Sequence, residues 1–416
     1  MVQKPVYTLN ALRGFGAIFV VFYHIVNLGN YIDLDPGYVP NFFKFFLNWD
    51  PLRVLIYFVI SGTVIQLSNK QALSNTNLNH YLKKRATRIY PIYALSLIIT
   101  LLISQRIYSA YTIVGNFTFL QIMFTDLIEE NNPIWSLHYE ILYYLLFIPI
   151  SYFNINPVKV AIVAFLIGVG NYFFYSYTHF LLLTSYSFGF VFWTSGLIIA
   201  KYLSDKAPGP IIYRNLISFL FLIICLPFIN KVKSLMIRFS DSIIGYDMVF
   251  PYKDDKTWVE MAVNFYDFSF LPYCLMAVIL FSNYKFKYQK AVLWIMQILP
   301  AYSLYSLFKM KGHMDVWTNI VPISSYLLSL LFLLRSTILE HISRKIFELF
   351  MWFGNISYGI YIIHMPLLVL YSQIPIYTGS IFSFSVRLFT YLLLTVISAY
   401  WLENRYQPFM IKLFSK

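Results

Sequence analysis

Long apolar stretches recur along almost the whole chain, and each is close to the length of a helix that crosses a bilayer. Such a helix takes about 20 mostly apolar residues. We interpret the following stretches as candidate spans: 11–29, 52–68, 86–104, 135–153, 158–175, 184–203, 213–230, 268–284, 291–308, 318–335, 352–372 and 384–402. We therefore expect an all-α polytopic membrane protein, a bundle of about 10–12 transmembrane helices.

The composition agrees with that expectation. Hydrophobic residues make up 59% of the 416 positions and charged residues only 12%, whereas soluble domains carry about 25% charged residues. A soluble protein of this composition could not cover its own surface, so the bilayer is the expected surrounding.

The net charge of +13 is attributed to membrane topology rather than to nucleic-acid binding, since basic residues gather in cytoplasmic loops. An orientation with both termini in the cytoplasm puts most of the 31 basic residues on that side. We expect one domain over residues 1–416, with an extracytoplasmic loop at about 231–267. That loop is interpreted either as a lid over an outer cavity or as a connector.

Two ionisable residues stand in the first apolar stretch. Arg13 and His24 are eleven residues apart, which places them on one face of a helix and about 16 Å apart along its axis. Arg13 alone could be a snorkelling anchor, and His24 could be a core histidine bonded to a neighbouring helix. Ionisable groups inside a membrane usually line a pathway or a site, and the shared face favours a joint role.

A basic patch follows in HYLKKRATRIYPIYAL (80–95). Arg85 and Arg88 are three residues apart and hence neighbours on a helix. One interpretation is topology or attraction to anionic lipid. The other is phosphate binding, because a guanidinium group binds phosphate with two parallel hydrogen bonds.

Glu140 lies inside the stretch NNPIWSLHYEILYYLLFIP (131–149). A carboxylate in a membrane helix needs a polar partner, and Ser136, Tyr143 and Tyr144 share its helical face, with Trp135 nearby. Glu140 is interpreted either as a hydrogen-bonded interfacial carboxylate or as a functional group that enters from the outer half of the membrane.

Two further polar positions are noted. Ser61, beside Gly62, is interpreted as part of a small-residue helix contact or as a place where a ligand approaches the backbone. Ser357, Tyr361 and His364 are spaced by four and three residues and form a polar stripe that either lines a cavity or joins two helices.

Taken in chain order, these motifs resemble the acyltransferase-3 family of integral membrane acyltransferases. The stretches that carry the resemblance are LNALRGFGAIFVVFYH with its arginine–ten residues–histidine spacing, YFVISGTVI, KKRATRIYPIYAL, IWSLHYEILYYLL, ISYGIYIIHMPLL and the terminal YWLENRYQPF. The resemblance implies an O-acyltransferase without a fused esterase-like domain. Members of this kind commonly acetylate surface polysaccharides.

The resemblance also implies substrates and a location. The expected donor is acetyl-CoA, an acyl-CoA substrate rather than a bound cofactor, and the expected acceptor is a hydroxyl of a glycan or lipid-linked glycan. The expected location is the plasma membrane, the inner membrane of a bacterium, in multi-pass form. No metal site is expected, and Cys225 and Cys274 lie in apolar stretches that indicate neither a disulfide nor a metal ligand.

Residue roles follow from that resemblance. Arg13, Arg85 and Arg88 would bind the CoA phosphates. His24 would act as general base on the acceptor hydroxyl or carry the acyl group as a nucleophile, and Glu140 would orient His24 or the acceptor. The remaining polar and aromatic positions would line the acceptor cavity: Ser61, Trp135, Ser136, Tyr143, Tyr144, Ser357, Tyr361 and His364. The alternatives are a transporter that uses intramembrane His, Arg and Glu, and an acyltransferase acting on a lipid or small molecule.

Overall fold

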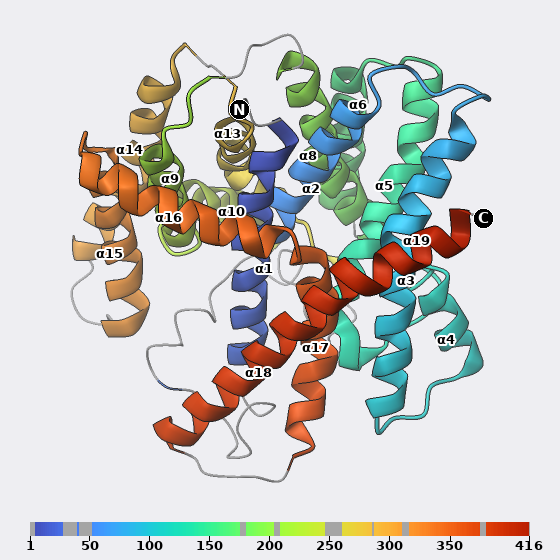
Figure 1. Cartoon of the computed structure of the whole chain (residues 1–416). Helices are drawn as coiled ribbons and strands as arrows, with labels where there is room; N and C mark the ends of the chain where they lie inside the picture. Colours follow the sequence, from blue (N-terminus) through green and yellow to red (C-terminus); the bar gives the residue numbers. More distant parts are fainter. Residues whose placement is uncertain are drawn as a thin grey trace. The chain divides into compact units, whose positions relative to one another are not determined.

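The computed structural model describes residues 5–27, 40, 52–174, 180–203, 209–245, 260–284, 287–309, 316–374 and 380–415. Within these ranges the chain is helical, with no strand and one isolated bridge between Gln121 and Thr125 (Figure 1). Every apolar stretch predicted as a span coincides with a helix, because a continuous apolar run satisfies its backbone hydrogen bonds internally only as a helix.

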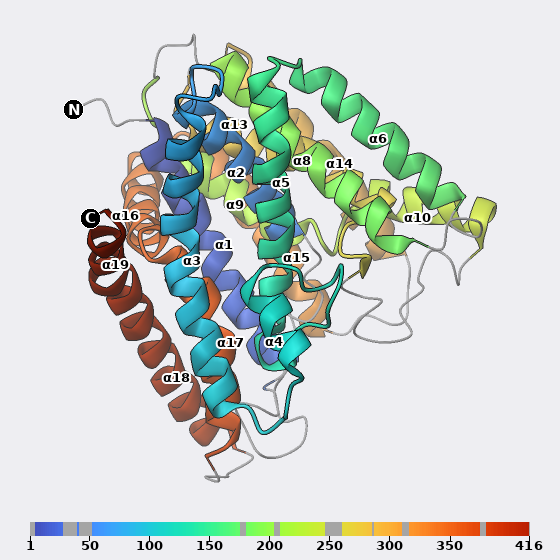
Figure 2. The same ribbon diagram turned by 90° about the vertical axis from the view of Figure 1, so that its right-hand side faces the viewer.

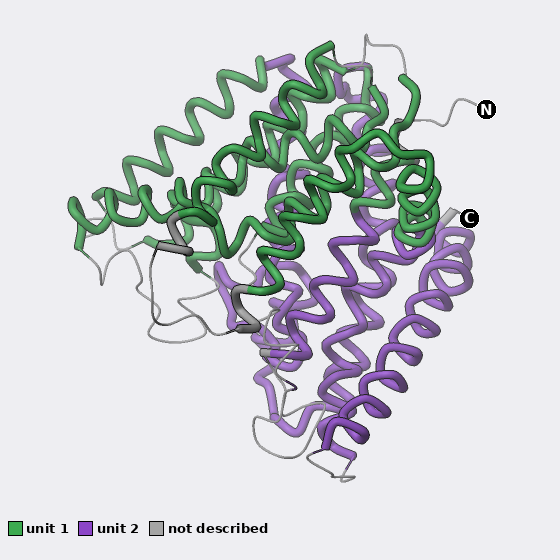
Figure 3. Tube along the Cα trace, turned by 90° about the vertical axis from the view of Figure 1, so that its left-hand side faces the viewer, with its two compact units in different colours: residues 1–12, 48–70, 156–351 green, residues 13–47, 71–155, 352–416 purple. Residues whose placement is uncertain are grey.

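The described residues form two compact units (Figure 3). Unit 1 contains residues 1–12, 48–70 and 156–351, and unit 2 contains residues 13–47, 71–155 and 352–416. The helix α1, Pro5–Asn27, belongs to unit 1 up to Leu12 and to unit 2 from Arg13 onward.

The helices of unit 1 are α2 (Leu52–Ser68), α6 (Pro157–Phe173), α8 (Leu181–Leu203), α9 (Tyr213–Cys225), α10 (Lys231–Ile244), α13 (Leu271–Phe281), α14 (Gln289–Lys309), α15 (Val316–Leu333) and most of α16 (Thr337–Gly354). A short 3-10 segment, Phe265–Phe270, leads into α13. Helix α8 packs against both α2 and α6. The loop expected at 231–267 begins with α10, and residues 246–259 lie outside the described ranges.

The helices of unit 2 are α3 (Leu78–Ile103), α4 (Ala110–Phe117), α5 (Trp135–Tyr152), α17 (Ser357–Ser372), α18 (Ile381–Trp401) and α19 (Gln407–Ser415). A 3-10 segment, Glu129–Ile134, precedes α5, and a π-helical segment, Leu402–Tyr406, joins α18 to α19. Figure 2 shows α3 beside α5, and α17 lies between α3 and α18. A cluster of buried hydrophobic side chains, mainly from α1, α3, α17 and α18, forms the core of this unit.

Four described helices are long and apolar enough to cross a membrane: Thr8–Val26, Leu78–Ile103, Leu181–Leu203 and Ile381–Phe414. Helices α15 and α16 pass the same test together but are bent by 119°, which would make a fifth. Several shorter apolar helices accompany them, among them α2, α6 and α17. The chain is thus a multi-pass membrane protein, while the full number of spans and the side of each terminus stay predictions.

A pair of glycines explains the close approach of α2 and α8. A Cβ atom at Gly62 would lie 1.9 Å from the Trp193 carbonyl oxygen, and one at Gly196 would lie 2.2 Å from that of Val59. The Thr63 hydroxyl shares its one proton between the Val59 carbonyl oxygen at 2.8 Å in its own helix and the Gly196 carbonyl oxygen at 3.2 Å across this contact. The motif at Ser61-Gly62 is therefore a small-residue helix contact, and the space beside its backbone is filled by protein.

Candidate functional site

Helix α17 places a fully buried histidine in unit 2. The Nδ1 atom of His364 lies 2.8 Å from the Tyr361 carbonyl oxygen and 3.2 Å from that of Ile360. Carbonyl oxygens only accept hydrogen bonds, so Nδ1 carries the proton of the neutral ring. The Nε2 atom then presents a lone pair, and this buried atom has no hydrogen-bond partner within the described residues. His364 is therefore a fixed tautomer with an available acceptor nitrogen.

His24 lies directly beside His364. Their ring centroids are 5.1 Å apart, with 52° between the ring planes, and the Tyr23 ring lies against His24 at the same separation. Helix α1 thus supplies one imidazole and α17 a second, although the two are 340 positions apart in the sequence. Together they form what we call the histidine pair.

One turn before His364, Tyr361 connects α17 to α5. Its hydroxyl donates to the Pro133 carbonyl oxygen and lies 2.6 Å from the Ser136 hydroxyl. Because Tyr361 has a single hydroxyl proton and the carbonyl can only accept, Ser136 is the donor in the second bond. The rings of Tyr361 and His364 have centroids 6.1 Å apart. The predicted polar stripe therefore contacts both α1 and α5.

Glu140 lies one turn further along α5 and accepts a hydrogen bond from the Tyr144 hydroxyl. The backbone carbonyl of Tyr144 in turn accepts from Tyr81 at 3.0 Å. The guanidinium of Arg85 packs over the rings of both Tyr81 and Tyr144, 6.0 and 5.9 Å from their centroids. Glu140 consequently lies close to the turn of α3 that carries Tyr81 and Arg85. Its role toward His24 stays a prediction.

A second acidic group, Glu403, stands at the same end of unit 2. Its carboxylate accepts from the backbone N–H of Gly359 at 3.0 Å, in the first turn of α17. One turn later the side-chain amide of Gln407 donates to the Arg88 carbonyl oxygen at 2.5 Å, which ties this segment to α3. Arg88 is exposed, whereas Arg13 is partly buried. Sequence reasoning did not select Glu403 as a site residue, although the terminal motif that contains it supplied a signal.

The remaining predicted site residues have structural partners. Trp135 packs its ring edge-on against Tyr139, 5.4 Å between centroids, and Tyr143 is fully buried. The Ser357 hydroxyl donates to the Gly354 carbonyl oxygen at 2.9 Å and so closes the turn before α17. Ser61 belongs to unit 1, where its hydroxyl accepts from the Trp193 indole N–H at 3.2 Å.

A buried polar link supports this arrangement and was missed by sequence reasoning. The side-chain amide of Asn131 donates to the Ser96 hydroxyl at 2.8 Å, and Ser96 donates to the Ile362 carbonyl oxygen at 3.1 Å. The segment before α5 is thereby held to α3 and α17 at the level of Tyr361. No simple spacing signal joins three residues so far apart in the sequence.

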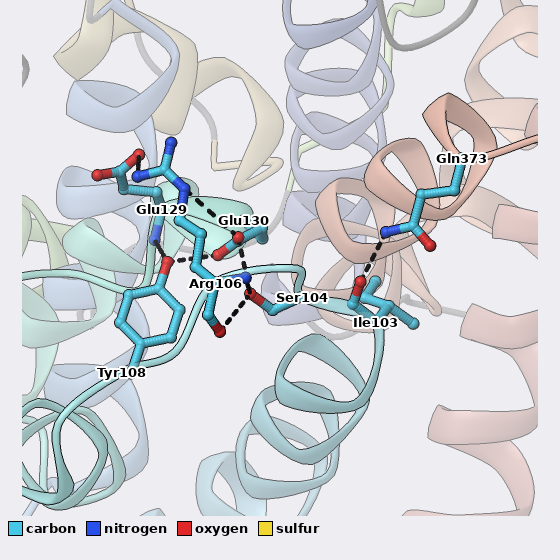
Figure 4. Close-up of polar contacts among 7 residues, drawn as sticks. All are labelled: Ile103, Ser104, Arg106, Tyr108, Glu129, Glu130 and Gln373. Atoms are coloured by element: carbon cyan, nitrogen blue, oxygen red, sulfur yellow. Dashed lines mark hydrogen bonds and ion pairs between the residues drawn. The ribbon is translucent and has the colours of Figure 1, made fainter.

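A separate polar cluster closes the Ile103 end of α3 (Figure 4). Glu130 accepts hydrogen bonds from Ser104 at 2.8 Å and from Tyr108 at 2.5 Å, and Arg106 forms an ion pair with Glu129. Burial, together with the hydrogen bond to Glu130, raises the pKa of Tyr108. The phenol therefore stays protonated and acts as a donor throughout the physiological range.

The family comparison assigns the chain. A family model described as an acyltransferase domain, of the acyltransferase-3 type, matches residues 6–305. The chain belongs to the acyltransferase-3 family. Within the matched residues of this acyltransferase lie Arg13, His24, Arg85, Arg88 and Glu140, whereas His364 and Glu403 follow the matched region. No curated protein and no solved structure matches the chain.

Proposed function

We propose that this acyltransferase moves an acetyl group from acetyl-CoA to a hydroxyl of a surface polysaccharide or of its lipid-linked precursor. Family membership supports the acyl transfer. The observation that carries the proposal is the histidine pair in unit 2, where α1, which also carries Arg13 eleven residues earlier, brings His24 against His364.

In this proposal the basic end takes the nucleotide part of CoA. Its phosphates are polyanionic and suit guanidinium groups, which offer paired donors. We place this end at the cytoplasmic face, where acetyl-CoA is available and where basic residues gather. The rise from Arg13 to His24 is on the order of 16 Å, which an extended pantetheine arm can cover. The thioester would then lie beside the histidine pair.

His24 serves as the general base in the transfer step. It removes the proton of the acceptor hydroxyl as that oxygen attacks the thioester carbonyl carbon. The C–S bond then breaks, and the CoA thiolate receives the proton from the imidazolium. The Nε2 lone pair of His364 accepts a hydrogen bond from the other ring N–H of His24, and so stabilises the positive charge that forms on His24. Ser136 and Tyr361 keep α5 and α17 in register around this point.

The proposal is tested by proton NMR of the surface glycan from cells with the wild-type protein, a deletion, and His24→Ala at matched membrane levels. Loss of the O-acetyl signal in both altered strains is the expected result, and the lost resonance identifies the modified sugar. An unchanged signal in the deletion strain contradicts the polysaccharide acceptor. Loss in the deletion but retention in His24→Ala keeps the enzyme and contradicts the role of His24.

A further inference from the structure

Helix α17 has a gap in its backbone hydrogen bonds at the turn that carries His364. Pro366 lies inside this helix. Proline has no backbone N–H, so the carbonyl oxygen four residues earlier, that of Ile362, lacks its usual donor within the helix. His364 stands midway between these two residues. The backbone on which the buried histidine is mounted therefore needs a donor from elsewhere.

The Ser96 hydroxyl of α3 supplies that donor. It donates to the Ile362 carbonyl oxygen at 3.1 Å, and both residues are buried. A similar replacement occurs in unit 1, where the Tyr273 hydroxyl donates to the Met296 carbonyl oxygen, four residues before Pro300 of α14, at 3.4 Å. Leaving a buried carbonyl without a donor is unfavourable, above all inside a membrane. The bond to Ser96 therefore favours one position of this turn of α17.

A count of protons fixes the direction of the Ser96 bond. The side-chain amide of Asn131 donates to the Ser96 hydroxyl oxygen at 2.8 Å and to the Thr100 hydroxyl oxygen at 3.3 Å. The Thr100 hydroxyl in turn donates to the Ser96 backbone carbonyl at 2.8 Å. The single hydroxyl proton of Ser96 is left for the Ile362 carbonyl, which can only accept. The hydroxyl is thus oriented toward α17 before any substrate binds.

The same turn is held from its other side by α18. The buried Tyr391 hydroxyl donates to the backbone carbonyl oxygen of His364 at 2.9 Å. The imidazole is itself bonded to backbone, because its Nδ1 donates to the Tyr361 carbonyl oxygen at 2.8 Å. A shift of this turn would therefore carry the ring with it and change where Nε2 points.

We propose that Ser96 is a positioning residue for His364: its hydroxyl replaces the backbone donor that Pro366 removes, and so sets the turn of α17 that presents Nε2 to His24. This inference rests on the proposed function, in which Nε2 of His364 stabilises the charge that forms on His24. Ser96 acts through the α17 backbone and takes no part in the transfer step itself.

The substitution Ser96→Ala removes the hydroxyl and should lower kcat about tenfold, because a small misplacement of a catalytic group is costly. The KM for acetyl-CoA should stay unchanged, since the arginines that we assign to donor binding are untouched. Ser96→Thr keeps the hydroxyl and should retain most of the rate. In a His364→Asn background, Ser96→Ala should cause no further loss, because the Nε2 lone pair is already absent.

A matched control stands in unit 1. The buried Ser218 hydroxyl of α9 also donates to a carbonyl oxygen of a neighbouring helix, that of Ser329 in α15, at 2.7 Å. Ser218→Ala should lower the melting temperature about as much as Ser96→Ala and leave kcat unchanged. If Ser96→Ala does not fold, Ser96→Cys, which has a weaker donor, should give a smaller loss of kcat in the same direction.

The experiment measures acetyl release from labelled acetyl-CoA by the purified full-length protein in liposomes. A lower kcat for Ser96→Ala in the wild-type background alone supports the positioning role. A full rate for Ser96→Ala, or an equal fold-loss in the wild-type and His364→Asn backgrounds, overturns that role and leaves the proposed function in place. No release by folded wild-type protein overturns the proposed function, and the positioning role with it.

Discussion

A methyl group added at Gly62 should force α2 and α8 apart. The new Cβ would lie 1.9 Å from the Trp193 carbonyl oxygen, where ordinary contact begins at 3.4 Å, so the helices would have to separate by about 1.5 Å, judged by the spacing of close-packed interiors. Backbone atoms stand on both sides of the contact, and no flexible side chain can move aside instead.

The cost follows from what that separation breaks. Overpacking costs about 1–3 kcal/mol. The Trp193–Ser61 bond and the weaker, shared Thr63–Gly196 bond cross the same contact and are together worth about 1–2 kcal/mol. Alanine in place of a glycine inside a helix stabilises that helix by about 0.5–1 kcal/mol, which offsets part of this loss. The net loss for Gly62→Ala is therefore about 2–4 kcal/mol, which lowers the melting temperature by roughly 5–15 °C for a unit of this size.

A matched control exists in α6. A Cβ atom at Gly170 meets no atom within 4 Å, so Gly170→Ala should leave the protein unchanged or slightly more stable. Both variants would be compared by thermal unfolding of the purified protein in detergent, followed by intrinsic fluorescence. Equal melting temperatures for the two variants would refute the packing argument and reopen the space beside Gly62 to a ligand.

Three further predictions concern unit 2. His364→Asn keeps a donor for the α17 carbonyls but removes the Nε2 lone pair. Acetyl transfer from labelled acetyl-CoA should therefore fall about a hundredfold, while the melting temperature stays unchanged. Full activity of this variant would exclude His364 from the chemistry. Arg88→Ala should weaken CoA binding by about tenfold in titration, and Arg88→Lys should weaken it less. Equal CoA binding by the wild type and both variants would contradict phosphate recognition by Arg88. Glu130→Gln should lower the free energy of unfolding by about 1–3 kcal/mol, because the new amide group would face hydroxyl donors. Glu129→Gln, at an exposed position, should lower it by less than about 1 kcal/mol. The reverse order in thermal unfolding would contradict the hydrogen bonds shown in Figure 4.

The sequence was sufficient to predict the long apolar helices and the spacing of the polar residues along them. A long continuous apolar run satisfies its own backbone hydrogen bonds when it forms a helix, and each predicted span coincides with a helix. The shared face of Arg13 and His24 required only the helical repeat. The stripe on α17 was also visible from spacing, and the structure shows that its Tyr361 and His364 meet α5 and α1.

Contacts between helices could not be predicted from the sequence. Nothing in the spacing places His24 beside His364, or Glu403 at the first turn of α17, because long-range packing has no local period. The amphipathic α16 was not predicted as a helix, since its charged residues interrupt the apolar pattern.

In the proposed mechanism, His24 catalyses acyl transfer from CoA while His364 stabilises its charge. The most direct measurement is the release and transfer of acetyl from isotopically labelled acetyl-CoA by the purified protein in liposomes, with wild type compared with His24→Ala. We predict that only the wild-type protein transfers labelled acetyl to the acceptor fraction. Without an acceptor, only the wild-type protein should slowly release labelled acetate to water. Equal rates for both proteins, or no release by a wild-type protein that is folded and binds CoA, would contradict the account.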